Sequence, residues 1–88
     1  KEKLPDDPHV MDTLGWVYYK KGNYDFAIME FSDSLAKIPE NATVYYHLGL
    51  SYNKKGEKTR AREALEKALS LDATFKGAEQ ARNLLSGM

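Results

Sequence analysis

The chain has 88 residues, enough for one small domain, and its 42% hydrophobic and 30% charged composition favours a folded helical domain over disorder. Its 13 Lys and Arg residues balance its 13 Asp and Glu residues, which argues against a dedicated nucleic-acid binder or a polybasic membrane-surface module. The absence of cysteine excludes a disulfide scaffold, a thiolate metal site and a cysteine nucleophile, and it is compatible with both the cytoplasm and the periplasm.

The first predicted elements are two helices joined by a tight turn. Asp7 can cap a helix over residues 9–21, and the proline after it suits the first helical position, where its missing N–H is not needed. Gly22 ends this helix, because glycine adopts the left-handed conformation freely. Asn23 is expected to cap a second helix over residues 24–36. The apolar residues of that helix recur at helical spacing: Tyr24, Ala27, Ile28, Phe31, Leu35 and Ile38.

A second hairpin of the same form follows. Asn41 is expected to cap a helix over residues 42–55, and Gly56 ends it. A helix over residues 58–71 comes next, and a fifth helix is predicted from Phe75 to Ser86. No segment has the pattern of a strand, and no apolar run is long enough to span a membrane. We therefore predict an all-α chain of five helices.

The two hairpins also match each other residue by residue at a separation of 34 positions. The identical pairs include Pro5 and Pro39, Val10 and Val44, Leu14 and Leu48, Gly15 and Gly49, Tyr18 and Tyr52, Lys20-Lys21-Gly22 and Lys54-Lys55-Gly56, Ala27 and Ala61, and Leu35 and Leu69. A fixed period of this length is typical of hairpins that stack on one another. The two mid-helix glycines each cost about 1 kcal/mol relative to alanine, so they indicate a close approach by a neighbouring helix.

These residues resemble the tetratricopeptide repeat. The first copy reads Met11, Leu14-Gly15, Tyr18, Ala27, Phe31 and Pro39, and the second reads Tyr45, Leu48-Gly49, Tyr52, Ala61 and Leu65, with Ala73 where proline is usual. The resemblance implies an α-solenoid of antiparallel helix-turn-helix hairpins. It divides the chain into a tail of a preceding repeat or a linker (1–7), two repeats (8–41 and 42–75) and a capping helix (76–88). Because the chain begins with Lys1, we expect a fragment of a longer repeat protein.

The resemblance further implies a non-catalytic module that binds a protein or peptide. In this family the first helix of each hairpin lines the concave side of a superhelix, and a helical wheel places twelve residues there: His9, Asp12, Thr13, Trp16, Tyr19, Lys20, Thr43, Tyr46, His47, Leu50, Asn53 and Lys54. Packing does not require these residues, yet several are aromatic, as in interface hot spots. We therefore predict a binding groove; burial of Trp16 and Tyr19 by a neighbouring repeat or chain is the alternative.

Three further hypotheses concern other surfaces and classes of function. Phe26 and Met29 lie opposite the apolar stripe of their helix and define a possible second contact surface. The face of Val10, Leu14 and Val17 would be covered by a preceding repeat, so a structural or self-associating segment, with a homodimer through this face, is the alternative function. An array attached to a catalytic domain is the third possibility.

No residues of the chain itself indicate catalysis or a cofactor. No phosphate-binding loop, nucleophile elbow or zinc-protease motif is present. His9 and His47 have only Asp12 as a third ligand candidate, so we expect no metal site. Some relatives clamp the C-terminal carboxylate of chaperones with basic residues in the groove. We expect no such clamp here, because the corresponding positions are Asp12, Trp16, His47, Gly77 and Ala81.

Overall fold

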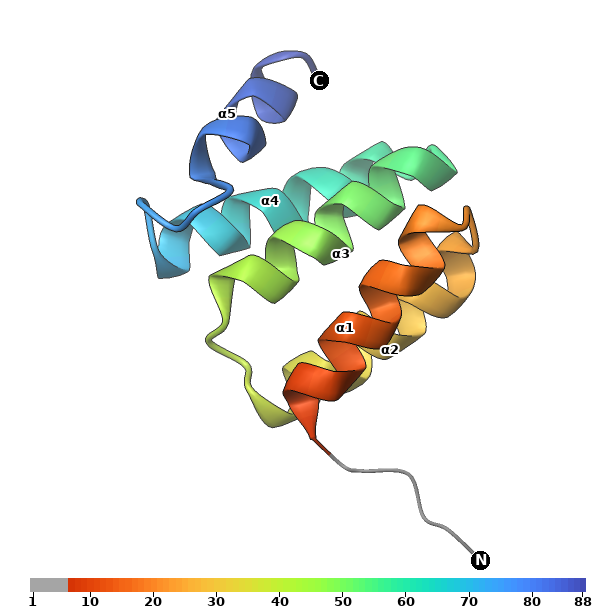
Figure 1. Ribbon diagram of the computed structural model, residues 1–88. Helices are drawn as coiled ribbons and strands as arrows, with labels where there is room; N and C mark the ends of the chain where they lie inside the picture. Colours follow the sequence, from red (N-terminus) through yellow and green to blue (C-terminus); the bar gives the residue numbers. More distant parts are fainter. Residues whose placement is uncertain (1–6) are drawn as a thin grey trace, which may run out of the picture.

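The computed structural model describes residues 7–88, which form five helices (Figure 1). The helices are α1 (Pro8–Lys20), α2 (Tyr24–Lys37), α3 (Ala42–Lys55), α4 (Lys58–Leu71) and α5 (Ala78–Ser86). Each packs on the next in chain order, as antiparallel pairs α1–α2 and α3–α4, with α5 against α4 at the end of the stack. The predicted all-α arrangement of stacked hairpins is thus confirmed. Residues 1–6 of the expected tail lie outside the described residues.

Most helix ends lie where the capping residues predicted them. The Asp7 carboxylate accepts a hydrogen bond from the backbone N–H of His9 at 2.8 Å, and the Asn41 side chain accepts one from the N–H of Val44 at 3.0 Å. Gly22 and Gly56 follow their helices with φ of 84° and 85°, in the left-handed region that favours glycine. These four residues therefore set the ends of α1 and α3.

One predicted cap and one predicted helix start need correction, while the predicted start of α2 at Tyr24 agrees with the structure. Asn23 occupies the N-cap position of α2, but its side chain makes no capping hydrogen bond. The fifth helix begins at Ala78, three residues later than predicted. Asp72 accepts hydrogen bonds from the backbone N–H and the hydroxyl of Thr74, at 2.9 and 3.1 Å, and this local turn competes with a helical start. Phe75 is buried in the core beneath that turn.

Two apolar clusters hold the stack together. The first joins α2, α3 and α4 through Ala27, Phe31, Leu35, Val44, Leu48 and Ala64. The second joins α3, α4 and α5 through Ala42, Leu65, Ala68, Phe75, Ala78 and Ala81. The mid-helix glycines lie at the close approaches predicted for them. A Cβ on Gly15 would stand 2.5 Å from the Phe31 ring, and one on Gly49 would stand 2.7 Å from the Leu65 side chain.

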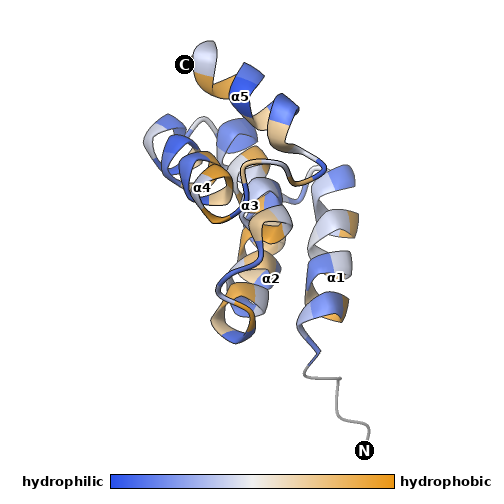
Figure 2. Ribbon diagram, turned by 90° about the vertical axis from the view of Figure 1, so that its left-hand side faces the viewer, coloured by the Kyte–Doolittle hydropathy of each residue, from blue (hydrophilic) through white to orange (hydrophobic). Residues whose placement is uncertain are grey.

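Within residues 7–88, one face of the first hairpin is not covered by another helix. Val10, Leu14 and Val17 are 38%, 39% and 44% exposed, and Figure 2 marks hydrophobic residues along α1. The residues 34 positions later, Val44, Leu48 and Ser51, are 1%, 8% and 0% exposed, because α2 packs on α3. Phe26 and Met29 of α2 are also exposed, at 52% and 49%. We call Val10, Leu14, Val17, Phe26 and Met29 the N-terminal face.

Within residues 7–88, no helix combines the length and apolar character needed to cross a bilayer.

Candidate binding groove

An open cavity of about 430 Å³ lies where the first helices of successive hairpins face one another. Its lining residues come from α1, α3, the turn before α5, and α5: Trp16, Thr43, Tyr46, His47, Lys76, Gly77 and Gln80. The lining combines aromatic rings with neutral polar groups and one lysine.

A row of neighbouring aromatic rings includes three residues that line the cavity, Trp16, His47 and Tyr46. Trp16 stacks on Tyr19 with ring centroids 4.9 Å apart, and its other neighbour is His47 at 4.6 Å. His47 lies 5.9 Å from Tyr46, which in turn lies 5.6 Å from Phe75. We call Tyr19, Trp16, His47 and Tyr46 the aromatic row. Because each ring contacts the next, the row offers a continuous apolar surface held in one arrangement.

Burial in this row affects the two phenols. Desolvation raises the pKa of Tyr46 above its ordinary value of 10.0, and desolvation, followed by the charges of Tyr24 and Tyr46, raises that of Tyr19. Both phenols therefore stay neutral at physiological pH. A neutral phenol can donate a hydrogen bond to a ligand while its ring supplies apolar contact.

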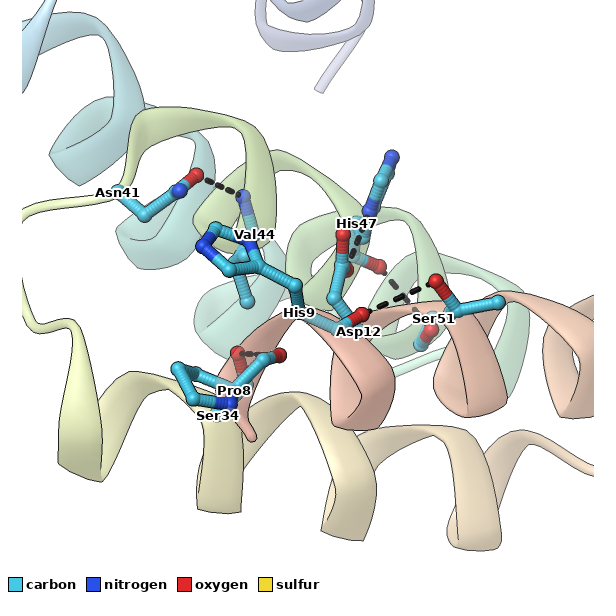
Figure 3. Close-up of polar contacts among 9 residues, drawn as sticks. Pro8, His9, Asp12, Ser34, Asn41, Val44, His47 and Ser51 are labelled. Carbon is cyan, nitrogen blue, oxygen red and sulfur yellow. Dashed lines mark hydrogen bonds and ion pairs between the residues drawn. The ribbon is translucent and has the colours of Figure 1, made fainter. Parts of the chain in front are cut away.

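Asp12 and His47 join α1 to α3 below the cavity. An Asp12 carboxylate oxygen lies 2.9 Å from Nδ1 of His47, and the two side chains are 23% and 17% exposed (Figure 3). A carboxylate only accepts hydrogen bonds, so Nδ1 carries the proton. Within the described residues, Nε2 of His47 has no hydrogen-bond partner, and in the neutral ring it is an acceptor. The pair therefore fixes the orientation and tautomer of a ring that lines the cavity.

Two buried serines make hydrogen bonds to backbone carbonyls of the helices that carry these residues. The buried Ser34 hydroxyl of α2 donates to the carbonyl of Pro8 at 2.8 Å, and Ser51 donates to the carbonyl of His47 at 3.0 Å (Figure 3). The first bond fixes the start of α1 against α2. The second satisfies a hydroxyl in the fully buried seam between α2 and α3. Sequence analysis singled out neither serine.

The predicted groove residues fall into three groups. Trp16, Thr43, Tyr46 and His47 line the cavity, and Asp12, Tyr19 and Lys20 contact its walls. Lys20 places its Nζ 5.5 Å from the centroid of the Trp16 ring. The remaining five do not line the cavity: His9, Thr13, Leu50, Asn53 and Lys54. Trp16 and Tyr19 are only partly buried within the described chain.

The segment around α5 contributes lining residues that were not predicted as groove residues from the sequence. Lys76 and Gln80 were not predicted, and Gly77 entered only as a clamp position. A Cβ on Gly77 would stand 2.6 Å from the Tyr46 ring, so the turn approaches α3 closely because this residue is glycine. The 34-residue shift places Gly77 opposite Thr43 and Gln80 opposite Tyr46. Extending the repeat by one more period would have found both.

A second hollow on the surface is lined mainly by packing residues, so it is a weaker candidate for a binding site. A hollow of about 300 Å³ lies between α3 and α4, lined by packing residues of the hairpin together with Arg60 and Glu63. Arg60 lies 5.9 Å from the Tyr52 ring at this hollow. Among residues 7–88, no cluster of three or more His, Asp or Glu side chains is arranged to hold a metal ion.

Two family models match the chain. One, described as TPR repeat, matches residues 15–56, and the other, described as Tetratricopeptide repeat, matches residues 42–75. The chain is also similar to interferon-induced protein with tetratricopeptide repeats 2 of Cricetulus griseus, at 36% identity over 53 residues. That alignment covers 60% of this chain and 11% of the relative. Residues 15–75 thus hold two tetratricopeptide repeats, and the chain belongs to this repeat family.

This membership defines a general class of function. Tetratricopeptide repeats generally mediate protein–protein interactions and are typically non-catalytic, and neither matching model describes a catalytic family. The fifth helix is consistent with a capping helix, since it follows the second repeat and packs on α4.

Proposed function

We propose that this chain binds an extended peptide or protein segment in the groove between α1, α3 and the start of α5. The observation that carries the proposal is the aromatic row, of which Trp16, His47 and Tyr46 line an open cavity although Trp16 and Tyr46 also pack against the two apolar clusters. Half-buried aromatic side chains beside polar groups are typical of interface hot spots. The ligand contacts are assigned to Trp16, Thr43, Tyr46, His47, Lys76 and Gln80.

Peptide display tests this proposal. A library of random peptides is selected on the wild-type chain, and the enriched peptides are measured against the double variant Trp16→Ala/Tyr46→Ala. We expect an affinity loss of about tenfold or more, because each truncated hot-spot residue typically costs over 1 kcal/mol. The matched control is Phe26→Ala/Met29→Ala, which removes two large apolar side chains from the other surface and should leave the affinity unchanged.

Two results would overturn the groove assignment. One is a selection that enriches no peptide on the wild-type chain. The other is unchanged affinity in the Trp16→Ala/Tyr46→Ala variant, with helical content by circular dichroism equal to that of the wild type. Loss of binding in the Phe26→Ala/Met29→Ala control instead would move the binding surface to the N-terminal face.

A second candidate function, self-association, is favoured by the N-terminal face. All five residues of this face are large, apolar and exposed, and all belong to the first hairpin, which favours an interaction site on that hairpin. In the second hairpin, α2 covers the positions of α3 that are equivalent to Val10, Leu14 and Val17. The α2 residues Ala27, Phe31 and Leu35 are already buried within the chain, so they are not free to cover the same face of a second copy. A second copy would therefore meet the N-terminal face with its own N-terminal face, in a two-fold symmetric dimer.

Sedimentation velocity over a wide range of concentrations tests the dimer. We expect a concentration-dependent shift to a larger species, and we expect Val17→Lys to abolish it, because two like charges would meet near the two-fold axis. A monomer at every concentration would exclude self-association and leave the face to a hairpin from an adjoining part of a longer protein.

A further inference from the structure

We propose that the groove selects a segment in which a large apolar or aromatic side chain is followed or preceded by Asp or Glu. This inference rests on the proposed peptide-binding function and adds the chemistry of the ligand. Its basis is the combination of an aromatic cavity with a lining whose charged residue is a lysine.

The cavity is built to take one bulky side chain. The two main rings of its lining are each supported from behind, Trp16 by Tyr19 and Tyr46 by Phe75. Gly77 lets the turn before α5 close on Tyr46, since any Cβ there would displace the ring. A supported, partly desolvated aromatic lining gains more from burying an apolar side chain than from burying a polar one.

The charged groups around the cavity favour an anionic neighbour for that side chain. Lys76 is the charged lining residue, and Lys20 stands over the Trp16 ring at the adjoining edge. None of the seven lining residues is acidic. The nearby carboxylate of Asp12 keeps its negative charge, but it does not line the cavity and is directed at Nδ1 of His47. A carboxylate on the ligand therefore meets an ammonium group, whereas a basic ligand residue meets like charge.

The neutral polar residues of the lining offer hydrogen-bonding groups to a peptide backbone that would pass between the aromatic rings and Lys76. Thr43 on α3 and Gln80 on α5 flank the cavity and offer both donors and acceptors. Nε2 of His47 adds an acceptor in the lining. Together they can bond a main chain that passes between the two helices, which positions the apolar side chain in the cavity and its acidic neighbour at Lys76.

Four display libraries, each embedded between fixed flanking sequences so that no free carboxyl terminus is present, test the inference. Their central residues are an apolar residue with Asp or Glu, an apolar residue with Asn or Gln, an apolar residue with Lys or Arg, and Ser with Asp or Glu. On the wild-type chain we expect the apolar–acidic library to be enriched most. Replacing the acid by its amide should weaken binding about two- to fivefold, the range of an exposed ion pair.

Charge reversal supplies the decisive comparison. Lys76→Glu should move the preference from the apolar–acidic to the apolar–basic library, while Lys67→Glu, at an exposed lysine of α4 outside the cavity, should leave it unchanged. The inference is overturned by a wild-type chain that enriches apolar peptides without preferring acids, by a preference that Lys76→Glu leaves in place, or by binding that requires a free carboxyl terminus. Failure of every library on the wild-type chain would instead overturn the proposed function itself.

Discussion

Asp12 and His47 come from different repeats, and the hydrogen bond between them places a histidine ring within the aromatic row. At the residue scale this pair is a directional contact between α1 and α3, because a hydrogen bond fixes how the two side chains are oriented. The aromatic neighbours of His47, Trp16 at 4.6 Å and Phe31 at 5.4 Å, hold the ring from two sides. A charged acceptor beside a partly buried ring makes a stronger hydrogen bond than a neutral one.

Asp12→Asn is predicted to change the tautomer of His47. An amide can donate to the ring as well as accept from it, so Nδ1 is no longer held in its protonated form. The variant should show a mixture of tautomers in the ¹⁵N resonances of His47 and a loss of about 1–2 kcal/mol in the free energy of unfolding. His9, the second histidine of the chain, is exposed and serves as an internal reference. Unchanged His47 resonances would contradict this reading of the pair.

At the scale of the element, the asparagines that precede α2 and α3 show that the residue type alone does not ensure a capping hydrogen bond. Both Asn23 and Asn41 precede a helix, but only Asn41 accepts a capping hydrogen bond. Asn41→Ala should lower the free energy of unfolding by about 1 kcal/mol, as the loss of a cap does. Asn23→Ala should change it by only a few tenths, since the side chain is exposed and makes no such bond. Urea denaturation of both variants measures the difference, and equal losses would refute the distinction.

The helices themselves could be predicted because their signals are local. Glycines with positive φ, capping side chains and a 3.6-residue apolar period act within a few residues of the helix ends that they mark. The start of α5 could not be predicted in the same way. Its position depends on the turn that Asp72 makes with Thr74 and on the burial of Phe75 against Tyr46, which comes from another helix.

The groove residues also divide into those that a local pattern predicts and those that depend on tertiary contacts. Trp16, Tyr46 and His47 could be found from a helical wheel, because they lie on the faces of α1 and α3 that are opposite the main packing stripe. Gly77 and Gln80 could be found by extending the repeat period, but Lys76 could not, since it lies in a turn whose path depends on tertiary contacts with Tyr46. The bond from Asp12 to His47 joins residues 35 positions apart, and no local pattern in the sequence specifies it.

At the scale of the whole molecule, the position of a repeat in the stack decides how much each of its residues contributes. Leu14 and Leu48 occupy equivalent positions of the two repeats, yet they are 39% and 8% exposed. The difference arises because α2 covers α3, while within the described residues no helix covers the outer side of α1. The same side chain therefore has one role in the core and another at the end of the stack.

Truncation of the two leucines measures this difference. Leu48→Ala should lower the free energy of unfolding by about 2–5 kcal/mol, the usual range for a buried leucine, and Leu14→Ala should lower it by less than half as much, because part of its surface is already in water. Thermal unfolding at several protein concentrations then tests whether Leu14 also takes part in a dimer. A dimer through the N-terminal face would raise the wild-type melting temperature with concentration, and Leu14→Ala would remove that dependence. Equal losses for the two variants at low concentration would show that a monomer buries Leu14 as deeply as Leu48, contrary to the structure.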